Sequence, residues 1–208
     1  RLLSKFGELT TEELHDYSKK CQELNIKVVL SWDILMVEDN FERAKLLIES
    51  ININQFDAIR AQDPGAINYI LESIPEIKIQ LQAERGSNNI QSLKMWKNLL
   101  GDNLDRIVLS AEIEKKSVRE FVNKIDIDFE VLGLGRILLF YSPRNLLSAA
   151  MDNSEKNSFV NVKSDESPNH SMDVIENIHG TFMFHHKDHF LLDNLEEIID
   201  IGVKFLRI

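Results

Sequence analysis

Short apolar runs alternate with amphipathic stretches along most of the chain. Six runs rich in Ile, Val, Leu or Phe, each bounded by polar or glycine residues, are typical of buried parallel strands. They cover residues 26–30, 57–60, 77–81, 106–109, 129–132 and 203–208. The pattern therefore predicts a parallel sheet whose strands are separated by helices.

The stretches between these runs contain signals for helix starts and stops. Thr10 and Glu13 fit a capping box, and Asp63-Pro64 places an N-cap acid before a proline suited to the first helical turn. Gly101 and Gly202 follow apolar periodic segments at positions that end helices. Strand alternating with helix indicates βαβ units, and both an open doubly wound sheet and a closed barrel have this signature.

The barrel is the preferred fold, because no G-x-G-x-x-G sequence follows any predicted strand. We expect an α/β protein with a parallel, TIM-like (β/α) barrel that is incomplete in this chain. The chain opens with Arg1, so we expect further residues before it and further strands after Ile208. Residues 1–208 are expected to form a single barrel segment, with a mobile loop or insertion at 152–173, where Ser and Asn are frequent and apolar periodicity is weak.

Composition narrows the functional classes. The net charge is -10, with 34 acidic and 24 basic side chains and no basic stripe, which disfavours autonomous binding to nucleic acid. No apolar run is long enough to cross a membrane, and no signal peptide is visible. The single cysteine, Cys21, excludes an internal disulfide and is typical of a reducing compartment, so we predict a cytoplasmic protein without a membrane partner.

Four blocks of sequence, in order, are similar to those of one protein family, the collagenase-like peptidases called "U thirty-two". The first block consists of Asp57-Ala58-Ile59, Asp63-Pro64-Gly65, residues 74–81, Asn89 and Trp96. The second, residues 106–113, resembles the family's R-V-V-L-S-R-E-L. The third, residues 134–148, resembles H-G-x-L-C-x-x-Y-S-G-R-C-L-L-S, and the fourth joins His179-Gly180-Thr181 to Lys187-Asp188, as in H-G-T-x-x-x-x-S-K-D.

The resemblance implies a β/α barrel and, in several branches of the family, oxygen-independent hydroxylation of RNA bases or of a ubiquinone precursor. Those branches hold an iron–sulfur cluster on four cysteines, and the RNA enzymes draw on prephenate, whereas other members are labelled proteases. Here Leu138 and Asn145 stand at the two cysteine positions of the third block, and Leu134, Pro143, Ala111 and Gln80 replace other motif residues. One cysteine cannot supply four thiolates, so we predict neither a cofactor nor a metal.

Four residues are candidates for catalysis. Glu112 follows a predicted strand, at the end where barrel chemistry lies, although it could equally be a helix N-terminal acid. His179, Lys187 and Asp188 stand in the fourth block, where a Lys–Asp pair could hold a carboxylate or orient a base. The alternative is a structural ion pair. His185 and His189 are four positions apart, so on a helix both imidazoles would share one face and could bind a metal together with Glu176 or His179. A polar strand-to-helix turn is the simpler interpretation.

Four further residues are candidates for substrate binding. Arg144 could bind a carboxylate or phosphate through both guanidinium nitrogens. Tyr141 precedes it, with core packing as the alternative role. Asp63 and Asn89 belong to the first block. We expect at least three of Glu112, Arg144, His179, Lys187 and Asp188 to line one concavity at the carboxyl ends of the strands.

Two functions remain open from the sequence. The first is a divergent member of the peptidase family that acts on a small carboxylate or an RNA-linked substrate. The second is a pseudoenzyme without a cluster that serves as scaffold or partner subunit for a homologous hydroxylase. Because an incomplete barrel exposes unpaired strand edges, we expect this chain to be completed by its own missing segments or by another copy. The expected partners are a homologous protein or a second copy of the chain.

Overall fold

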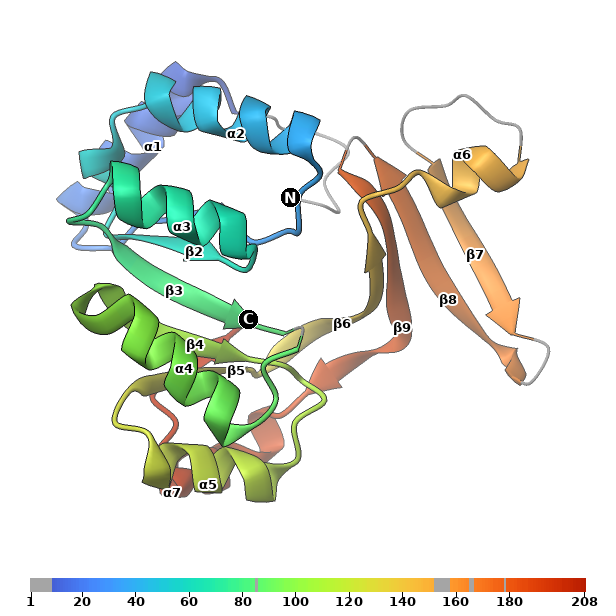
Figure 1. Ribbon diagram of the computed structural model, residues 1–208. Helices are drawn as coiled ribbons and strands as arrows, with labels where there is room; N and C mark the ends of the chain where they lie inside the picture. Colours follow the sequence, from blue (N-terminus) through green and yellow to red (C-terminus); the bar gives the residue numbers. More distant parts are fainter. Residues whose placement is uncertain (1–8, 85, 152–157, 165–166, 178) are drawn as a thin grey trace. The chain divides into compact units, whose positions relative to one another are not determined.

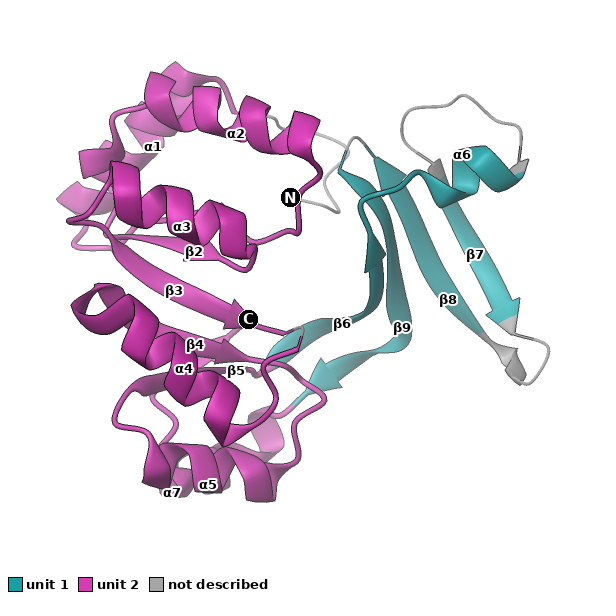
Figure 2. Cartoon of the chain, in the orientation of Figure 1, with its two compact units in different colours: residues 1–8, 134–190 teal, residues 9–133, 191–208 magenta. Residues whose placement is uncertain are grey.

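A computed structural model describes residues 9–84, 86–151, 158–164, 167–177 and 179–208. Contacts divide the chain into two compact units (Figure 2). The larger, here called the parallel unit, consists of residues 9–133 and 191–208. The smaller, here called the antiparallel unit, contains residues 134–190. None of the helices in the described parts of the chain is long and apolar enough to cross a membrane.

The parallel unit is built on a six-stranded sheet in which every neighbouring pair is parallel (Figure 1). Its order is β1-β2-β3-β4-β5-β10, which follows the chain. The strands are β1 (Val29–Trp32), β2 (Ala58–Ala61), β3 (Lys78–Ala83), β4 (Leu104–Leu109), β5 (Asp128–Leu132) and β10 (Phe205–Arg207). The six strands predicted from apolar runs are confirmed, with ends shifted by a few residues.

Most helices of this unit lie between consecutive strands. Four helix termini coincide with capping residues predicted from the sequence, namely Thr10, Asp63, Gly101 and Gly202. The helices are α1 (Thr11–Glu23), α2 (Glu38–Ser50), α3 (Pro64–Ser73), α4 (Ile90–Leu100), α5 (Lys115–Lys124) and α7 (Leu195–Ile201). Three single-turn 3-10 segments, Ile53–Gln55, Gly101–Asn103 and Leu192–Asn194, join them to neighbouring elements. Thr10 and Glu13 form the predicted capping box on α1, and Gly202 ends α7 with a left-handed φ of 94°.

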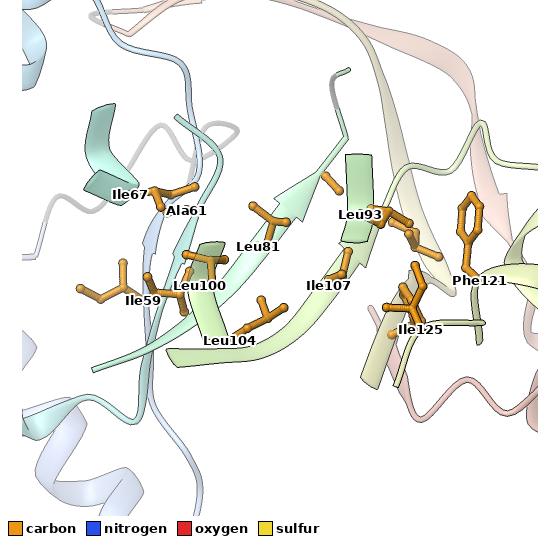
Figure 3. Close-up of a cluster of buried hydrophobic side chains, with 14 of the residues drawn as sticks. Ile59, Ala61, Ile67, Leu81, Leu93, Leu100, Leu104, Ile107, Phe121 and Ile125 are labelled. Carbon is orange, nitrogen blue, oxygen red and sulfur yellow. The ribbon is translucent and has the colours of Figure 1, made fainter. Parts of the chain in front are cut away.

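One face of the parallel sheet packs against these helices. Ile59, Leu81 and Ile107 on adjacent strands are fully buried, together with helix residues such as Ile67 and Leu93 (Figure 3). Burying each such side chain contributes about 1.5 to 3 kcal/mol. Because side chains alternate along a strand, the residues between these apolar positions face the other side of the sheet.

The opposite face is polar, and contacts across it show that the sheet curls. The Arg60 side chain on β2 reaches Glu130 on β5, although β3 and β4 lie between these strands in the sheet. Side chains on strands that are not neighbours can meet in this way only on a concave face. The curled parallel sheet has the form of a half-barrel, which is consistent with the predicted incomplete barrel.

The antiparallel unit contains a four-stranded sheet with the order β6-β9-β8-β7. Its elements are β6 (Leu134–Ser142), α6 (Leu146–Met151), β7 (Ser158–Ser164), β8 (Ser167–Asn177) and β9 (Gly180–Phe190). The sequence did not predict this sheet, because none of the six predicted strands lies within residues 134–190. A single β/α segment over the whole chain does not describe these residues.

Strands β7 and β8 occupy most of the range 152–173, where a loop or insertion was expected. Residues 152–157 and 165–166 lie outside the described residues. The overlooked signal is weak alternation with period two, in which Val174 and Glu176 are buried on β8 and Phe182 and Phe184 on β9. Polar residues dominate the intervening positions, so the apolar fraction of the segment resembles that of a loop.

Candidate functional site

The concave face of the parallel sheet, here called the inner face, has a polar row at mid-strand. Arg60, Gln80 and Arg106 are paired in register on β2, β3 and β4. The Gln80 Oε1 atom accepts hydrogen bonds from Arg60 Nε at 3.1 Å and Nη2 at 2.8 Å. Its Nε2 atom donates to Asp105 Oδ2 at 3.0 Å. Both the oxygen and the nitrogen of the buried Gln80 carboxamide are therefore hydrogen-bonded.

Glu130 on β5 joins the two arginines of this row. Its Oε2 atom lies 2.7 Å from Arg60 Nη2 and 3.4 Å from Arg106 Nη1. The guanidinium group of Arg106 also lies 3.5 Å over the ring of Phe205 and donates to Asp105 at 2.9 Å. Glu130 is only 3% exposed, so its charge depends on these two cations for compensation.

The next row along the strands contains polar atoms that no protein group satisfies. Gln82 is paired in register with Val108, and Val108 with Glu130. Ala61 pairs in register with Leu81. The residues that follow them, Gln62 and Gln82, therefore lie at the same level of the sheet. Among the described residues, the buried side-chain atoms without a hydrogen-bond partner are Gln62 Nε2, Gln82 Oε1 and Glu130 Oε1. All three belong to this one row.

A third level lies at the carboxyl ends of the strands. Glu84 follows β3, and its Oε1 atom accepts a hydrogen bond from Arg207 Nη2 on β10 at 2.7 Å. This contact also crosses the concave face, since β4 and β5 separate the two strands. Active sites of parallel barrels lie at this end of the strands. The inner face thus presents three polar levels whose arginines, Arg60, Arg106 and Arg207, each have a carboxylate partner.

Three residues that the sequence singled out in the parallel unit have roles in local structure. Asp63 caps α3 through Oδ1, which accepts from Ala66 N at 3.0 Å, and its Oδ2 accepts from Met36 N at 3.2 Å. Asn89 caps α4 by accepting from Ser92 N at 3.0 Å. Glu112 is exposed in the turn before α5.

Three other candidates lie together at one end of the antiparallel sheet. The Tyr141 hydroxyl donates to the His179 carbonyl at 2.9 Å, and its ring stacks on Phe182 with centroids 4.7 Å apart. The Arg144 carbonyl oxygen lies 2.8 Å from Thr181 Oγ1. Tyr141 is buried, which agrees with the packing role considered for it, and Arg144 is exposed.

Lys187 and Asp188 lie toward the other end of β9. Asp188 pairs in register with Arg136 near the start of β6, whereas Thr181 pairs with Ser142 at its end. Six positions separate Thr181 from Lys187, which corresponds to roughly 20 Å along a strand. The expectation that these residues line one concavity at strand ends is therefore wrong for Lys187 and Asp188, which lie within a long antiparallel strand instead of in a strand-to-helix turn.

The same strand changes the interpretation of the histidines. His185 and His189 are on β9 and not on a helix, so their separation is roughly 13 Å instead of one helical turn. The His185 ring accepts from Lys187 N at 3.1 Å. Across the part of the chain that the structure describes, no three His, Cys, Asp or Glu residues come close enough to hold a metal ion.

Glu176 on β8 organises the third sequence block. Its carboxylate accepts hydrogen bonds from Leu147 N at 2.7 Å, Ser148 N at 3.0 Å, the Ser148 hydroxyl and Thr181 Oγ1 at 2.8 Å. Burial raises the pKa of this carboxyl group, but the hydrogen bonds from Ser148, Thr181 and Leu147 outweigh burial, so the pKa lies below its ordinary value. Glu176 therefore fixes the start of α6 on strands β8 and β9.

The residues at the expected cysteine positions do not fit an iron–sulfur cluster. Leu138 is half-buried in β6 and pairs in register with Phe184. Asn145 is exposed, and its carbonyl accepts from Ala149 N at 3.3 Å. Neither side chain can supply a thiolate, and Cys21 is on α1 in the other unit. These 208 residues cannot provide the four ligands that such a cluster requires.

The sequence analysis missed the inner face because the predicted strands were judged by their apolar residues alone. Polar residues at alternate positions are the available signal: Arg60 and Gln62 flank Ala61, and Gln80 and Gln82 flank Leu81. In a sheet covered by helices on both faces, these positions would be apolar. Alternate polar residues within otherwise buried strands indicate a face that points into a barrel.

Comparison with known proteins identifies the family. The profile of Peptidase family U32 matches residues 2–208, and the chain belongs to this family. It is 24% identical over 156 residues to the tRNA hydroxylation protein P1 of Bacillus subtilis, a match that covers 75% of this chain and 36% of that protein. It is 30% identical over 102 residues to the tRNA hydroxylation protein P of Escherichia coli, covering 49% and 22% respectively.

The tRNA hydroxylation protein P2 of Bacillus subtilis is 24% identical over 210 residues, which cover 97% of this chain and 67% of that protein. The chain spans 36% and 22% of the length of the first two relatives. No solved structure matches the chain.

Proposed function

We propose that this chain forms part of a tRNA-hydroxylation-type protein and that the inner face of its parallel sheet binds the substrate. The observation that supports this role most directly is the row of unsatisfied buried atoms on Gln62, Gln82 and Glu130. Leaving one such group unsatisfied costs about 1 to 3 kcal/mol. Such groups are few in folded proteins, and a functional role or a bound water or ion accounts for many of them.

The names of the relatives favour hydroxylation over peptide hydrolysis. Three similar proteins are called tRNA hydroxylation proteins. A serine or cysteine peptidase requires a nucleophile hydrogen-bonded to a base. Among the described residues of the inner face, the polar contacts join arginines, a glutamine and carboxylates to one another. This arrangement suits recognition of a polar ligand better than attack on a peptide bond.

The substrate is proposed to be RNA-linked rather than a free carboxylate. Arg60, Arg106 and Arg207 would be the natural partners of a carboxylate, but each already pairs with an acidic residue. A carboxylate ligand would have to displace one of these partners. The acidic composition of the chain, with net charge -10, disfavours tight binding of RNA by this chain alone. A homologous partner or another copy is therefore proposed to help hold the tRNA, in the cytoplasm.

A scaffold role in complex with a cluster-bearing homologue is the second candidate. The observation that favours it is the replacement of the cysteine positions by Leu138 and Asn145. In this role the chain would still be required for hydroxylation, but substitutions on its inner face would leave the yield of modified tRNA unchanged. The two candidates therefore differ in a measurable way.

The experiment compares tRNA nucleosides from cells with and without the gene for this protein. Mass spectrometry of digested tRNA is expected to show a nucleoside carrying one additional oxygen atom only when the gene is present. Equal nucleoside profiles in the two strains would refute the hydroxylation role. Incubation of the purified protein with gelatin tests the peptidase alternative, and we expect no cleavage products.

A further inference from the structure

Helices α4 and α5 differ from the rest of the chain in the sign of their charge. Together they contain six basic residues and one acidic residue, Glu120, whereas the whole chain has 24 basic and 34 acidic side chains. The six basic positions are divided between residues 94–97 and 115–124, and acidic residues lie between these segments in the sequence. The sequence therefore shows no basic stripe, and the fold alone brings the two segments together.

The two helices are neighbours on the outer face of the parallel sheet. Helix α4 connects β3 to β4 and α5 connects β4 to β5, so both cover the same face (Figure 1). Leu93 of α4 and Phe121 of α5 belong to the same buried cluster. A hydrogen bond also links them, since Lys97 Nζ donates to the carbonyl oxygen of Asp126, just beyond the end of α5, at 2.6 Å. Lys94 lies three positions before Lys97 and therefore on the same flank of α4.

Two of the six cations are neutralised within the chain. Lys115 pairs with Glu197 on α7, at 2.6 Å between Nζ and Oε1. Lys124 pairs with Glu120 one helical turn before it. The single acidic residue of the two helices is thus already occupied, and Lys115 is occupied by a different helix.

The other four cations form no ion pair within the described part of the chain. The bond from Lys97 to a carbonyl oxygen leaves its charge uncompensated. Lys116 and Arg119 are exposed on α5, on the side away from the buried Val118. The four residues, here called the basic surface, are Lys94, Lys97, Lys116 and Arg119.

Uncompensated cations on an otherwise acidic protein attract a polyanion. Lysine and arginine bind RNA by replacing the counterions of its phosphates, and this binding does not depend on base sequence. The acidic remainder of the chain repels phosphates, so it favours an approach of RNA over α4 and α5. Four such contacts are few, which agrees with weak binding of RNA by this chain alone.

We propose that the basic surface contacts the phosphate backbone of the tRNA while the inner face acts on the nucleoside. The inference rests on the proposed function for the identity of the polyanion, and it goes beyond that function because it assigns a second surface to the substrate. Lys94, Lys97, Lys116 and Arg119 fix the position of the RNA and carry no sequence preference.

The test measures the affinity of the purified protein for a fluorescein-labelled, unmodified tRNA transcript by fluorescence anisotropy at several salt concentrations. With four phosphate contacts, the logarithm of the association constant should fall with the logarithm of the salt concentration with a slope of about −3 to −4. Between about 50 and 200 mM salt, the wild-type affinity should therefore fall about a hundredfold.

A triple variant locates the contact. Lys94→Gln, Lys116→Gln and Arg119→Gln together should reduce the magnitude of this slope by about 3 and lower the affinity at about 50 mM salt tenfold or more. The matched control combines Lys19→Gln, Lys20→Gln and Lys27→Gln, which remove the same charge from exposed positions in and after α1. This control should bind like wild type. If the first variant does not fold by circular dichroism, Arg119→Gln alone should reduce the magnitude of the slope by about 1.

Equal losses of affinity in the two triple variants would overturn the inference, and so would the absence of tRNA binding by wild type at about 50 mM salt. Sedimentation velocity tests the acidic surface of a second copy as the alternative partner. A wild-type dimer that the first variant loses, without any binding of tRNA, would overturn the inference as well. These measurements report binding and not hydroxylation, so unchanged tRNA nucleosides in cells would refute the proposed function separately.

Discussion

Arg60 on β2 and Glu130 on β5 are joined by an ion pair of 2.7 Å that spans two intervening strands. The contact requires the parallel sheet to be curled, and it brings a nearly inaccessible carboxylate to the centre of the concave face. Arg106 approaches the same carboxylate oxygen from β4 at 3.4 Å. The pair therefore links the curvature of the fold to the position of the candidate site.

Breaking this pair should destabilise the parallel unit substantially. Glu130→Gln removes the charge that compensates Arg60 and Arg106, and we expect a loss of about 3 kcal/mol in the free energy of unfolding. Both tryptophans, Trp32 and Trp96, belong to this unit, so their fluorescence during urea unfolding measures the effect.

The matched control for this measurement is Glu197→Gln. It breaks an ion pair with Lys115 in which the side chains are 41% and 60% exposed, and it should cost about 0.5 kcal/mol. Similar losses in the two variants would contradict the structural role assigned to Glu130.

Acid should weaken the antiparallel unit through Glu176. Its pKa is lower in the folded than in the unfolded chain, so the unfolded chain takes up the proton first as the pH falls. The stabilisation is complete above the ordinary glutamate pKa of about 4.3 and is lost as the pH falls through the lower folded value. Hydrogen–deuterium exchange of β8 and β9 should accelerate over this range.

Glu176→Gln should remove this pH dependence and raise exchange in β8 and β9 already at neutral pH, because the amide nitrogen of the new side chain cannot accept hydrogen bonds. Glu120→Gln on α5 is the control. The pKa of the Glu120 carboxyl group is also lowered, but by a hydrogen bond from Lys124 on the exposed surface. An exchange profile of the Glu176 variant that still follows pH as in wild type would argue against the assignment.

Gly180 should tolerate no side chain. Its φ is 119°, and a Cβ atom there would contact the Ser142 carbonyl oxygen and lie 2.8 Å from Pro143 Cα. Gly180→Ala should therefore destabilise the antiparallel unit by at least about 3 kcal/mol, through backbone strain and steric overlap together. Gly86→Ala has a positive φ of 80° but open space around the added atom, and it should cost about 1 kcal/mol. Hydrogen–deuterium exchange rates in β9 measure the effect of Gly180→Ala, and tryptophan fluorescence during urea unfolding measures the effect of Gly86→Ala.

Iron and sulfide added under anaerobic conditions should leave the purified chain colourless. Leu138 and Asn145 stand at the cysteine positions, and Cys21 is the one thiol in 208 residues. Absorbance spectroscopy and iron analysis check this expectation. A stoichiometric iron–sulfur spectrum from these 208 residues would show that the ligand assignment is wrong.

The sequence predicted the parallel unit well because its signals are local. Apolar runs such as residues 77–81 and caps such as Thr10 and Asp63 depend on neighbouring residues, and each leads directly to an element of the structure. The antiparallel unit was missed, because pairing of β8 with β9 depends on contacts between strands rich in polar residues. Local composition does not reveal such pairing.

The candidate site was predicted poorly for a related reason. Residues with reactive side chains, such as His179, Lys187 and Asp188, attracted attention by their chemistry and by the family resemblance. Gln62 and Gln82 have unreactive side chains, and their importance appears only when burial and missing hydrogen-bond partners are known. The register of neighbouring strands brings Gln62 and Gln82 to the same level as Glu130. The sequence alone does not give this register.

The most direct test of the account is the yield of hydroxylated tRNA nucleoside in cells that express Gln82→Leu in place of the wild-type protein. Mass spectrometry of digested tRNA, at matched protein levels, gives the ratio to wild type, with Lys115→Met as the control variant. If the inner face binds the substrate, Gln82→Leu should reduce the yield about tenfold or more, while Lys115→Met retains the wild-type yield. A wild-type yield from a folded Gln82→Leu protein would contradict the account and favour the scaffold role.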